Sequence, residues 1–303
     1  MSDAPPLIQR LLKRWPAKNP PHPIQALLDQ GKLEALYQPI ITLQSGAIDG
    51  HEALVRGQKD TDMGSPQALL DPAQTAQLQT ELELACVDRA LQGWDYPHTA
   101  GRIYLSLSAD TLIALSEPKA LQRLEGLFLK NQVPYKRAVV EITQHRKLKD
   151  LAALERCTTA LQALGCALAL DDVKASQRSL DLWLRLKPAV VKLDSRMTME
   201  LQQDPAKAKV LRTLANLGFK TGANLVAKAV EDAADLRIMR DAGIQMAQGN
   251  FLGSPAPACV DTLNLRARSV LAEKWSPPEP PSQPGELAPD SGLQKLVGMR
   301  WFD

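Results

Sequence analysis

The alternation of short apolar runs with longer segments of helical periodicity, along residues 24–276, constrains the fold most. Strands that alternate with helices form parallel sheets, and eight of them close most economically into a (β/α)8 barrel. The runs typical of strands are Leu36–Thr42, Ile48–Arg56, Arg102–Leu107, Ala138–Thr143, Cys166–Asp171, Ala189–Asp194, Lys220–Val226 and Gln245–Phe251. The sequence therefore predicts an α/β protein with a modified TIM (β/α)8 barrel.

The first two runs differ from the others because almost nothing separates them. Only a few residues, including Gln44-Ser45-Gly46-Ala47, lie between them. A connection this short makes a hairpin, since a parallel crossover needs a dozen residues or more. We therefore expect the barrel to begin with an antiparallel pair of strands.

Two segments carry the clearest helix signals. In Ala76–Leu91, apolar residues recur at helical spacing and share one face. In Asp204–Leu217, Asp204 suits the N-cap, Pro205 suits the first helical position, and Gly218 is expected to end the helix. Both segments lie between predicted strands.

Proline divides the chain into three parts. Of the 22 prolines among 303 residues, twelve lie within 1–23 and 277–289. We expect an N-terminal proline-rich arm (1–23), a barrel domain (24–272), and a proline-rich linker with an aromatic tail (273–303). Trp301-Phe302 in that tail either docks on a partner or folds back on the barrel, and the sequence leaves both open.

Composition excludes several classes of protein. Hydrophobic residues make up 45% and charged residues 23%, which is typical of a globular chain. No apolar run approaches ~18 residues, so we expect no direct membrane insertion. The formal charge of +2 gives no reason to expect a nucleic acid polymer as partner. Four scattered cysteines and no secretory signal favour reduced thiols and a cytoplasmic protein.

Charged and polar side chains occur at the carboxyl ends of several predicted strands, where charge is uncommon. They are Glu52, Glu141, Asp171, Asp172, Lys192, Asp194 and Gln248. The carboxyl ends of barrel strands meet at one mouth. A single carboxylate there more often caps the next helix, but several together repel each other unless a cation neutralises them. Such oxygen ligands suit Mg²⁺ or Mn²⁺, which can polarise a phosphate or acidify a water.

These residues lie in seven motifs that follow the order of a known family. The chain resembles the EAL domain, the family of cyclic di-GMP phosphodiesterases, over roughly 25–258. The motifs are Tyr37-Gln38-Pro39-Ile40 with Glu52-Ala53-Leu54-Val55-Arg56, Leu105-Ser106-Leu107-Ser108 ("VNLS"), Glu141-Ile142-Thr143-Gln144 ("ELTE"), Asp171-Asp172 ("DDFGTG"), Lys192-Leu193-Asp194 ("KID") and Gln248-Gly249-Asn250-Phe251-Leu252-Gly253 ("QGYLLG"). The resemblance implies a modified barrel with an antiparallel first strand, in agreement with the predicted hairpin.

The resemblance also implies a mechanism. Active family members hydrolyse cyclic di-GMP to linear pGpG with two divalent metals, Mg²⁺ or Mn²⁺. By position, the implied metal ligands are Glu52, Glu141, Asp171 and Asp172. Lys192 would hold or activate the water, with Asp172 and Glu231 as further catalytic residues. The residues implied to line the nucleotide site are Gln38, Glu52, Leu54, Arg56 and Gln248. The Arg56 guanidinium suits a phosphate oxygen.

Three departures from the family pattern bear on the metals. Ser106 stands where "VNLS" has a metal-binding asparagine, and Gln144 stands where "ELTE" has a glutamate that holds the loop after strand 5. That loop reads Val173-Lys174-Ala175-Ser176 instead of "FGTG", so both glycines are missing. We expect weaker metal binding, with the charge of Lys174 partly replacing a cation.

The fourth departure concerns strand 7, which should end in "AEGVE" with a catalytic last glutamate. Counting back from Gln248 identifies Glu231, whereas counting forward from Leu217-Gly218-Phe219 identifies Ala227. The two positions differ by four residues, which would require an insertion. The predicted strand Lys220–Val226 favours Ala227, but both alignments stay open.

Three functions follow. The first is a degenerate EAL domain that binds cyclic di-GMP as a signalling receptor with little or no hydrolysis. The second is an active, metal-dependent cyclic di-GMP phosphodiesterase that produces pGpG. The third is a regulator that acts by protein contact alone, with Lys174 and Lys228 filling the site and no metal or nucleotide bound. An unidentified protein partner is expected for the first and third, and a homodimer is left open.

Overall fold

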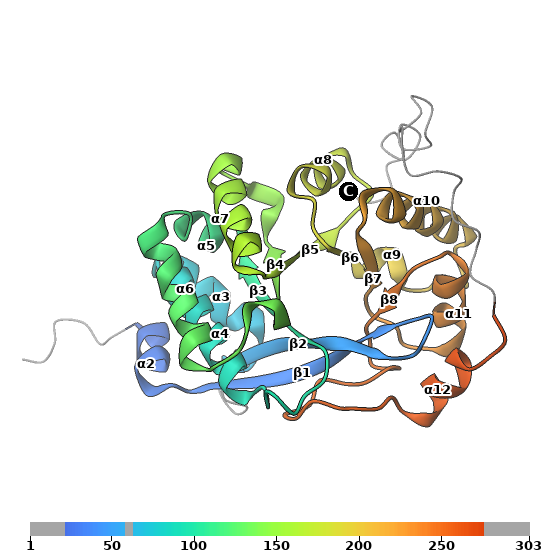
Figure 1. The fold of residues 1–303 in the computed structure, drawn as a ribbon, viewed down its shortest axis with the longest axis horizontal. Helices are drawn as coiled ribbons and strands as arrows, with labels where there is room; N and C mark the ends of the chain where they lie inside the picture. Colours follow the sequence, from blue (N-terminus) through green and yellow to red (C-terminus); the bar gives the residue numbers. More distant parts are fainter. Residues whose placement is uncertain (1–21, 58–62, 276–303) are drawn as a thin grey trace, which may run out of the picture.

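The computed structural model describes residues 22–57 and 63–275. Its centre is a closed barrel in which each strand pairs with the next and β8 pairs with β1 (Figure 1). The strands are β1 (Leu33–Thr42), β2 (Ile48–Gly57), β3 (Arg102–Ser108), β4 (Ala138–Thr143), β5 (Ala167–Val173), β6 (Val190–Leu193), β7 (Asn224–Ala227) and β8 (Met246–Ala247). The predicted α/β barrel is confirmed.

Helices surround the strands on the outside of the barrel (Figure 1). They are α2 (Pro23–Gln30), α3 (Pro66–Thr75), α4 (Gln79–Gly93), α5 (Ala109–Ala114), α6 (Pro118–Lys130), α7 (Leu151–Leu164), α8 (Gln177–Leu186), α9 (Ser195–Thr198), α10 (Pro205–Thr221), α11 (Ala233–Asp241) and α12 (Leu265–Leu271), with short 3₁₀ turns at Tyr135–Arg137 and His145–Lys147. Within the described ranges, none of them combines the length and hydrophobicity that a bilayer span requires.

The predicted hairpin is also confirmed. β1 and β2 pair antiparallel over almost their full length. Gly46 closes the turn with a φ of 68°, and its N–H donates to the carbonyl of Thr42 at 2.8 Å. β1 is antiparallel to β8 as well, whereas the remaining neighbours are parallel.

Two predicted helix boundaries were wrong. α4 begins at Gln79 rather than Ala76, because Gln77 takes a left-handed φ of 59° that separates it from α3. α10 continues past Gly218 to Thr221, and Gly222 ends it with a φ of 74°. β7 consequently begins at Asn224, four residues later than predicted.

Gly218 has a packing role instead. A Cβ at this position would lie 2.3 Å from Leu225 Cδ1 and 2.8 Å from the carbonyl oxygen of Ala223. The glycine therefore allows α10 to pack closely against β7.

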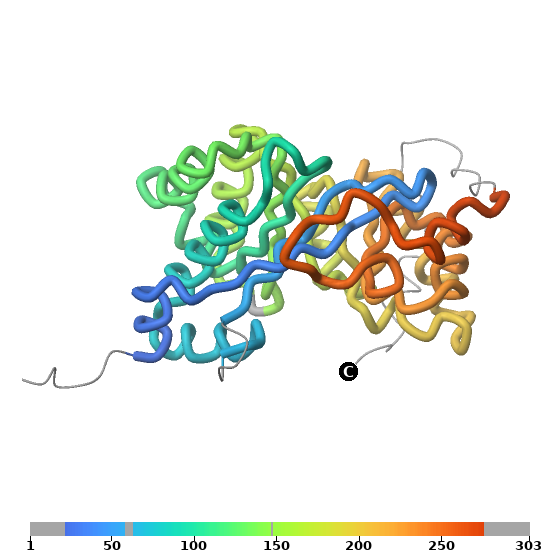
Figure 2. Tube along the Cα trace, turned by 90° about the horizontal axis from the view of Figure 1, so that it is seen from below, coloured from blue at the N-terminus to red at the C-terminus, as the bar shows by residue number. Residues whose placement is uncertain are grey.

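The segment after β8 lies beside the hairpin, as the tube in Figure 2 shows. The N–H of Tyr37 donates to the carbonyl of Ala256 at 2.7 Å, and the N–H of Ala256 donates back at 3.1 Å. Further along, Trp275 donates its Nε1–H to Asp241 at 3.0 Å, and the Arg240 guanidinium lies over its ring. Most of the predicted arms (1–23 and 273–303) lies outside the described residues, which begin at 22 and end at 275.

An apolar layer fills the barrel interior. One inward side chain from each of seven strands contributes to it: Ile40, Tyr104, Val139, Ala169, Val190, Val226 and Met246. On β2 the corresponding position is Gly50, where a Cβ would lie 2.2 Å from the carbonyl oxygen of Arg102. This layer forms the floor of the barrel mouth.

We predict opposite effects of alanine at two helical glycines. A Cβ added to Gly126 on α6 would have no neighbouring atom within 4 Å, so Gly126→Ala should raise the free energy of unfolding by about 0.5–1 kcal/mol. Gly218→Ala should lower it by about 1 kcal/mol or more, because overpacking exceeds the gain in helix propensity. Urea denaturation of both variants measures this. Equal stabilisation by both would contradict the packing role of Gly218.

Candidate functional site

A ring of polar side chains lies one layer above the apolar floor. Side chains two residues apart on a strand point to the same face. Moving two residues from each floor position toward the mouth gives six residues on strands and two, Lys228 and Gln248, that directly follow β7 and β8. The six are Gln38, Glu52, Ser106, Glu141, Asp171 and Lys192. The residues between them, such as Leu105, Leu170 and Val191, belong to the outer core under the helices. The period of the strands thus brings these eight residues together.

Lys192 is the buried centre of this ring. Its Nζ lies 2.8 Å from Glu52 Oε2 and 2.7 Å from Glu141 Oε1. The side chains of Lys192 and Glu141 have no solvent exposure, and that of Glu52 is 12% exposed. Buried charges are stable only when paired and hydrogen-bonded, so these three residues depend on one another.

Glu52 and Glu141 share one ammonium, but their pKa values are shifted in opposite directions. Burial raises the pKa of Glu141 to about 8, helped by the Glu52 charge and only partly offset by Lys192. Burial also acts to raise the pKa of Glu52, but the Lys192 ammonium outweighs it and holds the value below its usual range. Burial would lower the pKa of Lys192, yet Glu141 and Glu52 raise it above its ordinary value. Glu52 is therefore the more acidic partner.

Lys228 forms a second charged group with the aspartate pair at the end of β5. Its Nζ lies 2.8 Å from Asp171 Oδ1 and also contacts Asp172 Oδ1. The side chains of Lys228 and Asp171 are 19% and 13% exposed, whereas that of Asp172 is 53% exposed. Burial acts to raise the pKa of Asp171, but the ammoniums of Lys192 and Lys228 lower it overall.

Gln38, Glu52 and Gln248 form a hydrogen-bonded cluster on the hairpin side of the ring, which we call the amide corner. Gln248 Nε2 donates to Glu52 Oε2 at 2.6 Å and to Gln38 Oε1 at 3.1 Å. Gln38 in turn donates to the carbonyl of Gly253 at 3.1 Å. An open depression of about 360 Å³ lies here, lined by Gln38, Glu52, Lys228, Ala229, Glu231, Gln248, Gly249, Asn250 and Pro255.

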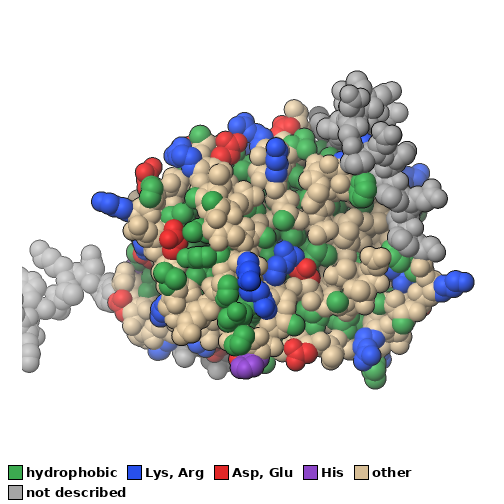
Figure 3. Space-filling view, viewed as in Figure 1, with side chains coloured by type: hydrophobic (Ala, Val, Ile, Leu, Met, Phe, Trp, Pro, Cys, Tyr) green, Lys and Arg blue, Asp and Glu red, His purple; other side chains and the backbone are tan. Residues whose placement is uncertain are grey.

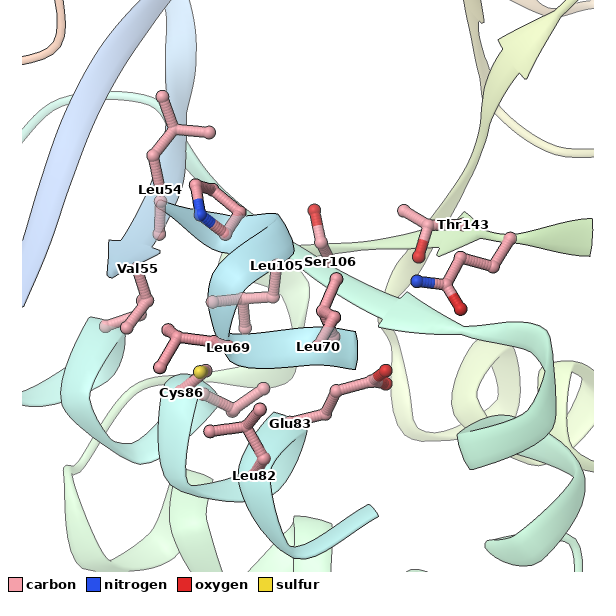
Figure 4. Close-up of a pocket in the computed structure, with 15 residues that line it drawn as sticks. Leu54, Val55, Leu69, Leu70, Leu82, Glu83, Cys86, Leu105, Ser106 and Thr143 are labelled. Atoms are coloured by element: carbon pink, nitrogen blue, oxygen red, sulfur yellow. The ribbon is translucent and has the colours of Figure 1, made fainter. Parts of the chain in front are cut away.

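A second cavity, of about 140 Å³, lies between β2, β3 and helices α3 and α4. Its wall is mainly apolar, with Leu54, Leu69, Leu70 and Leu82 around it and Ser106 and Thr143 on one side (Figure 4). Ser106 Oγ donates to Glu141 Oε2 at 3.0 Å, so it links this cavity to the buried charges. Of the residues implied to line a nucleotide site, Leu54 lies here.

Several residues singled out in the sequence lie elsewhere or have other partners. Arg56 lies further along β2, with its Nε 3.6 Å from Glu34 Oε2. Gln144 Oε1 accepts from Gln74 at 3.0 Å rather than holding the loop after β5. His145 contacts the strand before that loop, with its Nε2 2.6 Å from the carbonyl oxygen of Asp171 on β5.

Lys174 is not the cation beside the aspartate pair. Its Nζ lies 3.9 Å from Asp194 Oδ2, and Asp194 also accepts from Arg196 at 3.0 Å. The expectation that Lys174 partly replaces a cation was wrong, because Lys228 holds that place. The signal was the position of Lys228, two residues beyond Val226 on the inward face.

The backbone at the end of β7 favours Glu231 over Ala227 as the last residue of its motif. Ala227 faces the outer core and cannot reach the mouth, whereas Lys228 faces inward. Ala229 has a left-handed φ of 57°, where "AEGVE" has glycine. Ala227-Lys228-Ala229-Val230-Glu231 therefore aligns residue by residue without an insertion. Glu231 lines the depression, and Lys228 stands where the motif has its first glutamate.

The carboxylates do not fit a divalent metal in this arrangement. Asp171 and Asp172 each give one oxygen to the Lys228 ammonium, which stands where the family motif has a glutamate, while Glu52 and Glu141 contact Lys192 of the "KID" motif. Among residues 22–57 and 63–275, no three His, Cys, Asp or Glu side chains are arranged to hold a metal ion. The asparagine donor expected from the family pattern is replaced by Ser106, which donates to Glu141 instead of offering an amide oxygen.

We predict that Lys192→Met destabilises the fold by roughly 3–5 kcal/mol, because it leaves the buried Glu52 and Glu141 side chains without their shared cation. Adding Glu141→Gln to that variant should recover part of the loss, since it removes one of the two acidic groups. Urea denaturation of the single and double variants measures both effects. A loss as small as that of the exposed Lys220→Met would contradict the central role of Lys192.

We also predict a pH effect of Glu141. Its folded pKa of about 8 exceeds that of the unfolded chain, so its stabilising contribution is complete below the unfolded pKa and is lost as pH rises toward 8. Between pH 5 and pH 8, wild type should therefore lose stability relative to Glu141→Gln by on the order of 1 kcal/mol or more. Urea denaturation at each pH compares the two. A constant difference would contradict the raised pKa.

Comparison with known proteins places these features in a family. Residues 23–255 match the model of the EAL domain. An uncharacterized protein of Azorhizobium caulinodans is 27% identical over 74% of this chain and 31% of its own length. The cyclic di-GMP phosphodiesterase RocR of Pseudomonas aeruginosa is 25% identical over 76% of this chain and 59% of its own length. The chain thus spans about a third of the first relative and less than two thirds of the second.

The fold also matches solved structures. The crystal structure of the Xanthomonas citri FimX EAL domain in complex with c-diGMP superposes with a TM-score of 0.68, covering 83% of this chain and 95% of that one at 20% identity. The antiparallel first strand, the order of the motifs and the match over most of the chain agree. The protein belongs to the EAL domain family.

Proposed function

We propose that this protein binds cyclic di-GMP as a signalling receptor and hydrolyses it little or not at all. The observation that carries the binding half is the amide corner, in which Gln248 joins Glu52 and Gln38 beside an open depression. These are three of the five residues that the family resemblance implies for the nucleotide site.

The two cavities of the mouth suit the chemistry of such a ligand. Cyclic di-GMP carries flat purine bases together with charged phosphodiesters. The apolar cavity beside Leu54 offers a surface for a base, and the depression beside Lys228 offers a cation and amide donors. The FimX EAL domain was solved with this nucleotide, which supports the same ligand class here.

The proposal that the protein hydrolyses the nucleotide little or not at all rests on the contacts between lysines and carboxylates in the mouth. Family hydrolysis uses divalent metals, and the carboxylates that would bind them here contact lysines. Lys228 also takes the place of an acidic residue in the strand-7 motif. RocR is a phosphodiesterase, so hydrolysis is the alternative, and the experiment below decides between them.

Surface charge favours a small ligand over a polymer. On the face shown in Figure 3, Lys and Arg side chains are scattered among acidic and apolar ones and do not form a continuous basic surface. This agrees with the near-balanced charge of +2. We propose a cytoplasmic receptor whose barrel (24–272) senses the nucleotide and whose arms or surface reach an unidentified protein partner.

The test is a calorimetric titration of the full chain with cyclic di-GMP, with and without Mn²⁺, followed by assay for pGpG in the same tube. We expect binding below ~100 μM in both conditions and no accumulation of pGpG. Gln248→Ala should weaken binding about tenfold, because it breaks the amide corner.

The matched control is Gln162→Ala, since Gln162 is exposed on α7 away from the mouth. Absence of binding by wild type at ~100 μM would reject the receptor function. Steady production of pGpG with Mn²⁺ would reject the non-hydrolytic half and favour the phosphodiesterase.

A further inference from the structure

We propose that Lys228 is a built-in cation that takes the place of a divalent metal at the aspartate pair, so that the mouth works without metal. The metal part of this inference stands on the structure alone. The nucleotide part rests on the proposed function.

The first argument is the contact geometry. The Nζ of Lys228 contacts one carboxylate oxygen of Asp171 and one of Asp172 at the same time. Asp171 is mostly buried, so its charge needs a cation close by. One ammonium between two carboxylates supplies that charge from within the chain.

The second argument is that the backbone of Lys228 is held in place. Its carbonyl accepts a hydrogen bond of 2.6 Å from Thr198 Oγ1, and Thr198 is fully buried. Two residues on, the N–H of Val230 donates to the carbonyl of Gln248 at 3.1 Å, and Gly249 packs against Val230 so closely that a Cβ would lie 2.2 Å from its nitrogen. The backbone is therefore anchored at the carbonyl of Lys228 and again two residues later.

The third argument is steric and electrostatic competition. A divalent ion at Asp171 would have to displace the Lys228 ammonium, which the anchored backbone keeps near the mouth. An ammonium left beside a divalent ion repels it. Replacement of Lys228 by glutamate reverses this: it adds a carboxylate where a cation stood and restores the acidic residue of the family motif.

The experiment is calorimetric titration of the full chain with Mn²⁺ alone. The variants are wild type, Lys228→Glu, Lys228→Met, and Lys220→Glu as the control for charge. Lys220 is exposed on α10, so its variant makes the same charge change away from the mouth. Circular dichroism and the melting temperature establish which variants are folded.

We expect no saturable Mn²⁺ binding below ~1 mM for wild type or Lys220→Glu, and binding at least tenfold tighter for Lys228→Glu. Lys228→Met should bind with intermediate affinity, because it frees the aspartates without adding a ligand. If Lys228→Glu does not fold, Lys228→Met alone tests the proposal. Mn²⁺ binding by wild type as tight as by the variants would overturn the proposal, as would variants that bind no better than wild type.

A second arm addresses the nucleotide. Cyclic di-GMP affinity of wild type should be unchanged by EDTA, and Lys228→Met should weaken it at least tenfold. Loss of wild-type affinity in EDTA would overturn the metal-free mode. If wild type binds no cyclic di-GMP in either condition, the proposed function fails, and the Mn²⁺ titration alone decides the role of Lys228.

Discussion

The structure depends on one buried ammonium. Lys192 lies inside a barrel whose floor is apolar, and it has no access to water that could solvate its charge. Its two carboxylate partners come from β4, two strands away from its own strand β6, and from β2, four strands away in either direction around the closed barrel. Because an unpaired charge at this depth is costly, the triad fixes the relative positions of three strands. Replacing such a triad with apolar side chains often leaves stability unchanged, so its retention is better explained by the shape of the mouth than by stability.

The two lysines of the ring neutralise different carboxylates. Lys192 is fully enclosed and pairs with Glu52 and Glu141, whereas Lys228 lies nearer the solvent and pairs with Asp171 and Asp172. Lys228 supplies at the aspartate pair, with a covalently attached charge, what a mobile ion could supply. An ion is gained or lost with its concentration, but a side chain is always present. A receptor built this way responds to the nucleotide without also responding to the supply of metal.

The barrel could be predicted from the sequence because its hydrophobic residues recur with the periodicity of strands and helices. The eight runs, the hairpin at Gly46 and the strand-end positions of Glu52, Glu141 and Asp171 all follow from local pattern. The error at β7 arose because Gly218 was taken as a helix end, although tertiary packing against Leu225 explains it. The third function placed Lys228 at the mouth, but that shift of four residues obscured its inward register after β7. The partners of Lys228 and Lys174 could not be predicted, because both directly follow strand ends and contact residues far apart in sequence.

The closing strand has a consequence for dynamics. β8 contains only Met246 and Ala247, so the seam between β7, β8 and β1 has few ladder hydrogen bonds compared with the long hairpin. Regions with few such bonds open first in native-state amide exchange. Gln248 follows directly and ties this seam to Glu52 and Gln38. A ligand held by these side chains would bridge both edges of the seam, so its arrival would slow exchange there before it altered any larger feature of the molecule.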